Sequence, residues 1–171
     1  NFEYSSLEDI FEKLPEKNVT LIALNHVEDP RNLGAIVRTG LCAGAVGILI
    51  PRDRAAGITK WAVRTSQGAV FEIPIARVTN ISETLKNCKE KGFWVYGLSE
   101  RAKQRYDHVR YSERTLIVAG GEDVGLGKLV ERTCDETVSI PMFGSVGSLN
   151  VSVSVGIVLF EILRQRDFVR N

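Results

Sequence analysis

The stretch GSVGSLNVSVSVGI, residues 144–157, decides how the C-terminal part of this chain folds. Between Leu149 and Val155 apolar and small polar residues alternate, which is typical of a β-strand. As a helix, the same segment carries one continuous apolar stripe, made of Val151, Val155, Val158, Leu159 and Ile162. The helix accounts for the whole segment and the strand for only seven residues, so we predict a helix. Ser148 or Asn150 is then its N-cap, whose side chain accepts hydrogen bonds from free backbone N–H groups.

The rest of the chain alternates between strand-like and helical patterns. Strands are expected at residues 19–25, 45–51, 69–75, 93–98, 115–120 and 137–141, and helices at 29–44, 58–68 and 81–92. Short strands separated by helices predict an α/β fold: a mostly parallel sheet with helices on both faces. Residues 1–18 are more polar and contain Pro15, so we expect an N-terminal linker or an added helix before a domain of residues 19–171.

Composition excludes several classes of protein. At 171 residues, with 44% hydrophobic and 25% charged residues, the chain has the composition of one globular domain. We expect no membrane span, no signal peptide and a cytoplasmic location. The three cysteines form no CxxC pair, which favours buried, reduced thiols, and His26 and His108 are isolated, so no metal site is expected. A net charge of +1 means that a nucleic acid would be held by local patches.

Three segments are candidates for chemistry, and each also has a purely structural interpretation. In DPRNLGAIVRTG, residues 29–40, Asn32 is otherwise a cap and Arg38 a solvated charge. LIVAGGEDVGLGK, residues 116–128, is a strand running into a glycine-rich turn, but it matches neither the phosphate-loop nor the GxGxxG fingerprint. Such a turn still suits a ligand beside the strand ends. The third segment is the opening stretch, in which Ser148 and Asn150 are otherwise only caps.

Three motifs together resemble one family. NLGAIVRT, VAGGEDVGL and IPMFGSVGSLNVSVSVGIVLFE stand in the order and spacing of the signature motifs of the SpoU (TrmH-type) branch of the SPOUT RNA methyltransferases. The resemblance runs from Val19 to the C-terminus. Residues 50–80 look most like those of the bacterial 23S rRNA guanosine-2′-O-methyltransferases. The resemblance implies a homodimer whose C-terminal portion forms a deep trefoil knot that binds S-adenosylmethionine. It also implies a catalytic domain that lacks the usual N-terminal L30e-like RNA-binding domain.

The resemblance also assigns residues to a site. Those matching the family's catalytic positions are Asn32, Arg38, Glu122, Ser148 and Asn150, and those expected to hold S-adenosylmethionine are Gly120, Gly121, Ile140, Met142 and Leu149. Arg38 is the family's proposed activator of the ribose hydroxyl. A guanidinium rarely gives up its proton, so orienting a phosphate is physically easier, and the sequence does not separate the two roles.

The RNA partner and the exact reaction leave alternatives. Two basic patches are candidates for phosphate contact, RAKQRYDHVR at 101–110 and PRDRAAGITKWAVR at 51–64, although each also fits a solvated surface. The expected reaction is 2′-O-methylation of a guanosine in 23S rRNA. Its alternatives are tRNA Gm18-type methylation and thiostrepton-resistance-type adenosine methylation of rRNA. A non-catalytic S-adenosylmethionine- or RNA-binding module and a generic nucleotide-binding α/β protein are the rival classes.

Overall fold

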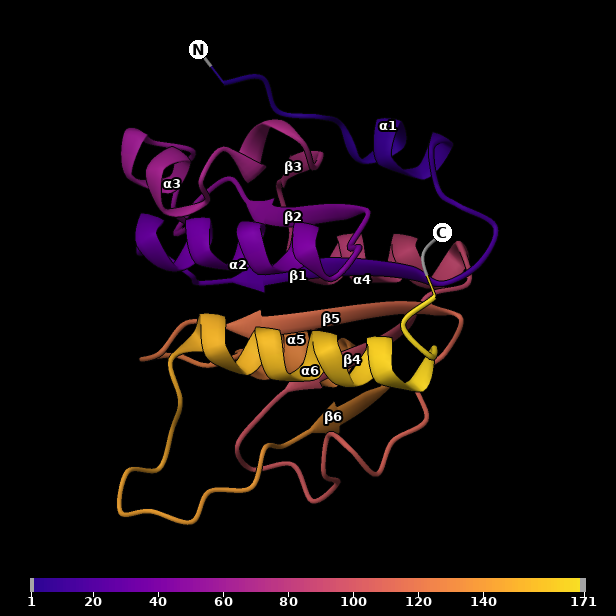
Figure 1. Ribbon diagram of the computed structural model, residues 1–171, viewed down its shortest axis with the longest axis vertical. Helices are drawn as coiled ribbons and strands as arrows, with labels where there is room; N and C mark the ends of the chain where they lie inside the picture. Colours follow the sequence, from indigo (N-terminus) through magenta and orange to yellow (C-terminus); the bar gives the residue numbers. More distant parts are fainter. Residues whose placement is uncertain (1, 170–171) are drawn as a thin grey trace.

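A single six-stranded parallel sheet organises the computed structural model, which describes residues 2–169 (Figure 1). Its strands lie in the order β3-β2-β1-β5-β4-β6. Their bounds are β1 Val19–Asn25, β2 Gly47–Pro51, β3 Ile75–Val78, β4 Trp94–Leu98, β5 Arg114–Gly120 and β6 Glu136–Val138. Every strand pairing is parallel, which confirms the expected α/β fold and places all the carboxyl ends along one edge of the sheet.

Strands β1 and β5 form the centre of the sheet. They pair in register along their whole length, from Val19 opposite Arg114 to Asn25 opposite Gly120. All seven residues of β1 are buried, as are the five inner residues of β5. Near-continuous apolar runs of this kind are characteristic of strands covered on both faces. The chain order therefore changes direction between β1 and β5, where a parallel sheet leaves a crevice at its carboxyl edge.

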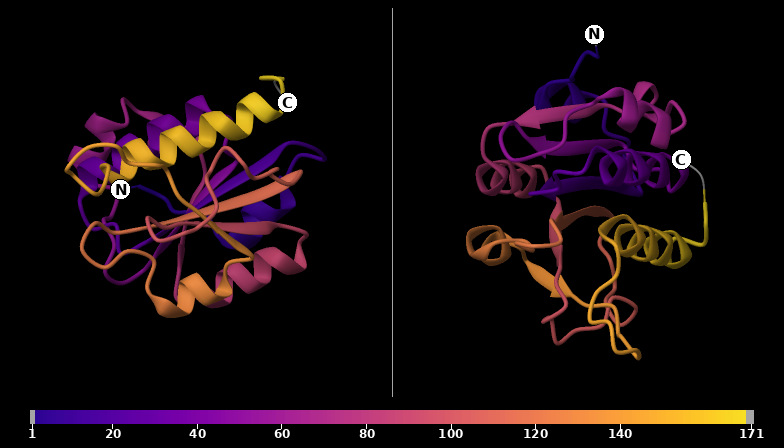
Figure 2. Two further views of the ribbon diagram at one scale, coloured as in Figure 1. Left: turned by 90° about the horizontal axis from the view of Figure 1, so that it is seen from below. Right: turned by 90° about the vertical axis from the view of Figure 1, so that its left-hand side faces the viewer.

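Helices cover both faces, as predicted (Figure 2). One face carries α2 Pro30–Cys42, α3 Lys60–Thr65 and α6 Val151–Gln165, which share one apolar cluster with β1, β2 and β5. The other carries α1 Leu7–Glu12, α4 Ile81–Glu90 and α5 Lys128–Thr133 over a second cluster. Helix α1 lies within the segment expected to be a linker or an added helix, and its Ile10 is buried in the second cluster.

Helix α6 answers the question raised by the alternating stretch. It begins at Val151, and its N-cap is Asn150, whose side chain accepts a hydrogen bond from the backbone N–H of Ser152. All five residues of the predicted apolar stripe are buried: Val151, Val155, Val158, Leu159 and Ile162. The helix prediction is confirmed, and between the two candidate caps the structure selects Asn150. No helix among residues 2–169 is both long and apolar enough to span a membrane.

Two local predictions are wrong. Residues 69–75 were expected to be a strand, but Ala69–Phe71 form a short 3-10 helix and β3 begins only at Ile75. Gly68 turns the chain with φ +86°, and the Phe71 N–H donates to the Gly68 carbonyl, so the run curls before it reaches the sheet. Buried thiols were also expected, but Cys42 is exposed, whereas Cys88 is buried and Cys134 partly so; all three are free.

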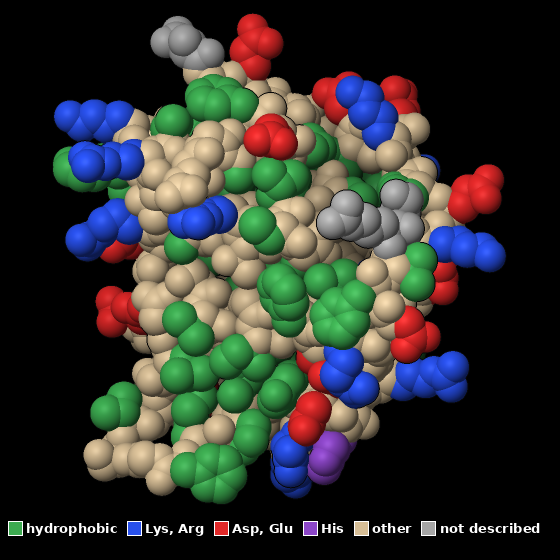
Figure 3. Space-filling model, in the orientation of Figure 1, with side chains coloured by type: hydrophobic (Ala, Val, Ile, Leu, Met, Phe, Trp, Pro, Cys, Tyr) green, Lys and Arg blue, Asp and Glu red, His purple; other side chains and the backbone are tan. Residues whose placement is uncertain are grey.

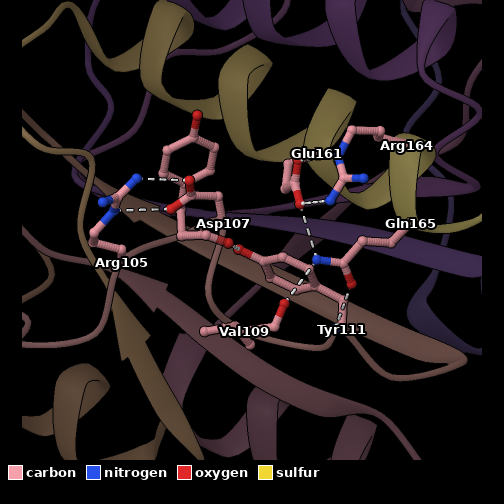
Figure 4. Close-up of polar contacts among 8 residues, drawn as sticks. Arg105, Asp107, Val109, Tyr111, Glu161, Arg164 and Gln165 are labelled. Atoms are coloured by element: carbon pink, nitrogen blue, oxygen red, sulfur yellow. Dashed lines mark hydrogen bonds and ion pairs between the residues drawn. The ribbon is translucent and has the colours of Figure 1, made fainter.

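The last turn of α6 is tied to the loop that follows β4. The Gln165 side chain donates to the carbonyl of Val109 at 2.7 Å and accepts from the N–H of Tyr111 at 3.0 Å (Figure 4). It also donates to Glu161, whose carboxylate is held by Arg164 through two bonds of 2.8 Å. These contacts fix the far end of α6, so its N-terminus projects from a rigid helix at the carboxyl edge of the sheet.

Candidate functional site

Three of the predicted catalytic residues meet at the carboxyl edge of the sheet. Asn32 lies in the first turn of α2, Glu122 follows β5, and Asn150 caps α6. The Asn150 Nδ2 donates to Asn32 Oδ1 at 2.9 Å and to Glu122 Oε1 at 3.4 Å. Segments that are far apart in the chain are therefore brought into one polar cluster at the carboxyl edge of the sheet.

The N-caps of α2 and α6 explain how the side chains of this cluster are positioned. Helix α2 is capped by Asp29, whose side chain accepts from the N–H of Arg31 at 2.8 Å, with Pro30 in the first helical position. Asn32 is therefore not a cap, and its amide is available to Asn150. Asn150 uses its Oδ1 for the helix and its Nδ2 for the site. A single side chain thus fixes the start of α6 relative to α2.

Arg38 and Ser148 do not join this cluster. Both are exposed, and neither side chain forms a hydrogen bond or an ion pair within residues 2–169. Arg38 lies on α2 more than one turn beyond Asn32, as the helical spacing indicated. A guanidinium on an exposed helical surface keeps its five donors for an external ligand, so Arg38 is placed to meet a bound group rather than to order the site.

Gly120 and Gly121 have a structural reason to be glycine. A Cβ on Gly120 would collide with the backbone of Gly125, and one on Gly121 with the carbonyl of His26. The Gly121 N–H donates to the carbonyl of Asn25 at 2.9 Å, and Gly121 accepts from the Gly125 N–H at 2.8 Å. The chain after β5 therefore folds back tightly, and this close packing holds Glu122 near α6.

Asn25 is a residue that the sequence interpretation missed. It ends β1, is buried, and its Nδ2 donates to the carbonyl of Leu126 at 2.9 Å. This bond anchors the turn that carries Glu122 to the last residue of the central strand. Its position in the sequence could have identified it, because an asparagine at the carboxyl end of a buried parallel strand lies at the ligand-binding edge of the sheet.

The loop between β6 and α6 carries the remaining cofactor candidates. Ile140 and Met142 are partly buried, and Leu149 is 36% exposed. Within the described chain, residues 140–149 neither donate nor accept a hydrogen bond. A loop of this kind can bind an adenosine group. The apolar side chains contact the adenine ring, and the free backbone N–H and C=O groups form hydrogen bonds with its polar edge. The donor set therefore fits S-adenosylmethionine.

A recess on another part of the surface is not the candidate site. It has a volume of about 490 Å³ and lies between residues 107–113 and the end of α6, away from all ten predicted site residues. Its Arg166 is already engaged: the guanidinium donates to Thr20 Oγ1 at 2.7 Å and to the carbonyl of Ser112 at 3.1 Å. We favour the carboxyl edge because its polar groups are open. Residues 2–169 contain no cluster of three or more metal-ligating side chains.

A parallel sheet with a polar cluster and an open loop at its carboxyl edge is the arrangement of an α/β domain that binds a ligand there. Residues 19–160 match the SpoU rRNA Methylase family, and the chain belongs to that family. The chain is 40% identical over 168 residues to the putative TrmH family tRNA/rRNA methyltransferase YacO of Bacillus subtilis, covering 97% of this chain and 68% of the relative.

Two further similarities bear on the length of the chain and on its cofactor. An uncharacterized tRNA/rRNA methyltransferase of Mycobacterium avium is 49% identical over 85% of this chain, which spans 47% of that relative. The SpoU methyltransferase AviRb of Streptomyces viridochromogenes, solved in complex with AdoMet, superposes with a TM-score of 0.87 at 27% identity, covering 99% of this chain and 65% of that one. The predicted cofactor is confirmed for the family, which depends on S-adenosylmethionine.

Proposed function

We propose that this domain transfers a methyl group from S-adenosylmethionine to the 2′-hydroxyl of a ribose in RNA. The observation that carries the proposal is the meeting of Asn150, Asn32 and Glu122 beside a loop whose backbone groups are unbonded. The names of the relatives, tRNA/rRNA methyltransferases, support RNA as the substrate. Because cellular RNA is the substrate in this proposal, the enzyme acts in the cytoplasm.

The residues of this domain then align the acceptor hydroxyl with the methyl donor. When bound, S-adenosylmethionine supplies a methyl group already activated on a sulfonium, so no metal or covalent nucleophile is needed. The backbone of residues 140–149, with Gly120 and Gly121, holds the cofactor. The Asn150–Asn32–Glu122 cluster keeps the starts of α6 and α2 fixed, so that the two reacting groups meet in line. Alignment of this kind can lower a barrier by roughly 7–11 kcal/mol.

Arg38 and Ser148 contact the RNA in this proposal. Both are exposed side chains without a partner in the described chain. Arg38 pairs with a phosphate next to the target ribose, which a planar fork of N–H donors does well. The proton of the 2′-hydroxyl leaves to that phosphate or to water. Direct proton abstraction by Arg38 is the second possibility, and it would require a guanidinium that has given up its proton, which is rare in proteins.

The surface of α6 bears on the oligomeric state of the protein. Helix α6 also carries apolar residues outside its buried stripe, and these form an exposed stripe with Val153 at 49% and Phe160 at 45% exposure. An apolar surface covers this part of the molecule (Figure 3). We propose that a second copy covers it, giving a homodimer, and that the C-terminal portion is knotted. Residues 19–171 then form the catalytic domain, and RNA recognition is completed by parts of a longer protein, since the chain spans about half of its mycobacterial relative.

The preferred substrate is a guanosine of 23S rRNA, with tRNA Gm18-type and thiostrepton-resistance-type rRNA methylation as alternatives. Mapping 2′-O-methyl groups in the ribosomal and transfer RNA of a deletion strain tests this choice. We expect one 23S rRNA site to lose its methyl group and to regain it when the gene is restored, but not with an Arg38→Ala gene. Loss of a tRNA methyl group would select the alternative, and an unchanged RNA would refute the proposed activity.

Calorimetry separates cofactor binding from turnover. We expect the 171-residue chain to bind S-adenosylmethionine but not ATP or NAD, and to methylate RNA more slowly than a longer version that carries an RNA-binding domain. Preferential binding of ATP or NAD would favour a nucleotide-binding protein instead. Cofactor binding without turnover in every version of the protein would favour a non-catalytic module.

A further inference from the structure

An exposed tryptophan stands on the basic surface beside the site. The ring belongs to Trp61 in α3, which is 51% exposed, and the Nζ of Lys60 lies 5.7 Å from its ring centroid. In the same segment Arg52, Arg54 and Arg64 are also exposed. None of these four cations forms an ion pair within residues 2–169. The segment 52–64 thus combines an accessible aromatic face with four unpaired cations against one acidic residue, Asp53.

Helix α3 is fixed close to the candidate site. Gly34 allows it to cross α2 with the backbones almost touching, because a Cβ on Gly34 would lie 2.7 Å from the carbonyl oxygen of Ala62. Gly34 lies between Asn32 and Arg38 on α2. The segment 52–64 follows β2, so it leaves the sheet at the same edge as Asn150 and Glu122 (Figure 1). In Figure 3, Lys and Arg side chains gather at the end of the molecule where α3 lies.

The other candidate surfaces match RNA less well. In the loop 101–110, the Arg105 guanidinium is paired with Asp107 at 2.8 Å, which neutralises part of its charge (Figure 4). Trp94 is similarly exposed, at 46%, but its Nε1 donates to the carboxylate of Glu136 at 2.8 Å, so its surroundings are acidic. Of the two tryptophans in the sequence, Trp61 alone lies among cations.

We propose that Trp61 is a stacking platform for an unpaired base of the RNA, and that Lys60, Arg64 and the arginines of residues 52–54 hold the flanking phosphates. The inference rests on the proposed RNA activity and adds the form of the substrate: a single-stranded segment beside the target ribose. Aromatic stacking with basic contacts is the usual way to bind unpaired nucleotides, and double-stranded RNA does not expose its base faces. The patch therefore selects loops or flipped nucleotides over a continuous helix.

The two tryptophans provide a matched pair of reporters. In Trp94→Phe the emission comes from Trp61, and in Trp61→Phe it comes from Trp94. Each variant is titrated with a single-stranded RNA of about ten nucleotides and with a duplex of the same length. We expect the single strand to quench Trp61, weakening as salt rises from about 50 to about 200 mM, and to leave Trp94 unchanged. Quenching by the duplex to the same extent would overturn the proposal.

Affinity gives an independent measurement. Trp61→Ala should weaken binding of the single strand by about 5- to 100-fold, Trp61→Phe should retain most of the affinity, and Trp94→Ala should bind like the parent. If the parent binds and methylates RNA while Trp61→Ala does so equally well, the platform is refuted and the methyltransferase proposal stands. If the parent neither binds nor methylates RNA, both fall. A shift of Trp61 emission with protein concentration alone would assign the patch to a second copy instead.

Discussion

Asn150 and Asn32 are joined side chain to side chain, with the Asn150 Nδ2 donating to the Asn32 Oδ1 at 2.9 Å across 118 positions of sequence. Asn150 is also the N-cap of α6. The residue therefore has two separable roles: one holds the helix, and the other ties that helix to α2 and Glu122. The difference between these roles can be measured.

Asn150→Ser should keep the cap and lose the bridge, because a serine hydroxyl caps a helix as well as asparagine does but is too short to reach Asn32. We expect unfolding near that of the parent and RNA methylation reduced at least about tenfold. Asn150→Ala should additionally cost about 1 kcal/mol of stability. Parental turnover in Asn150→Ser would mean that the bridge is only structural.

Arg38→Ala should abolish turnover and leave S-adenosylmethionine affinity within a few-fold, because the exposed Arg38 side chain forms no hydrogen bond or ion pair within residues 2–169. A loss of about 10² in rate corresponds to roughly 2.7 kcal/mol of transition-state stabilisation. Arg38→Lys should recover part of the rate if a point charge suffices, and little if a bidentate fork is needed. Near-normal turnover in Arg38→Ala would make the residue a surface charge.

The exposed stripe of α6 should mediate self-association. We expect sedimentation of the chain at micromolar concentration to give a dimer, and Phe160→Glu, which places a charge on the 45%-exposed ring position, to give a monomer. Phe71→Glu is the matched control, since Phe71 is more exposed, at 68%, but belongs to the 3-10 helix Ala69–Phe71 and not to α6. A monomeric parent would remove the dimer from the proposal.

Gln165→Ala should destabilise the fold. The substitution leaves the Tyr111 N–H and the Val109 carbonyl without their partner at the base of α6. Leaving such groups unsatisfied costs about 1–3 kcal/mol, which chemical denaturation can measure. Gln67→Ala, at an exposed position after α3, serves as a control in which we expect little change.

Glu161 should give stability a dependence on acid pH. Its hydrogen bonds with Arg164 hold its pKa below the ordinary value of 4.5. A lowered pKa in the folded state contributes stability that is fully present above pH 4.5 and is lost as the pH falls through the folded-state pKa. Glu161→Gln should therefore be less stable than the parent at neutral pH, and the difference should shrink in acid. An undiminished difference at low pH would show that the carboxylate charge is not responsible.

The elements were easier to predict from the sequence than their meeting points. The stripe from Val151 to Ile162 identified α6, because helical periodicity is a local signal. The contact of Asn150 with Asn32 and Glu122 depends on β5 lying beside β1, and no local pattern encodes strand order. The family motifs predicted Asn150, Asn32 and Glu122 one by one. That their side chains are in contact could be learned only from the three-dimensional structure.

One wrong prediction and one rejected alternative have related causes. Residues 69–75 contain the apolar residues of a strand, but Gly68 at positive φ turns the chain before it can pair. The structural alternative for Asn32, a helix cap, is rejected because the helix begins earlier and Asp29 occupies the N-cap position. In both cases the local composition was correct and the backbone conformation decided the outcome.

The pairing of β1 with β5 has a consequence for how the protein is made. The first central strand emerges from the ribosome early, yet its partner follows about 95 positions later, as the bond from Asn18 to Glu113 illustrates. One flank of β1 must therefore wait while most of the chain is synthesised. Folds dominated by such distant pairings close slowly and expose apolar strands meanwhile. During synthesis, β1 is the segment of this chain that most needs protection from aggregation.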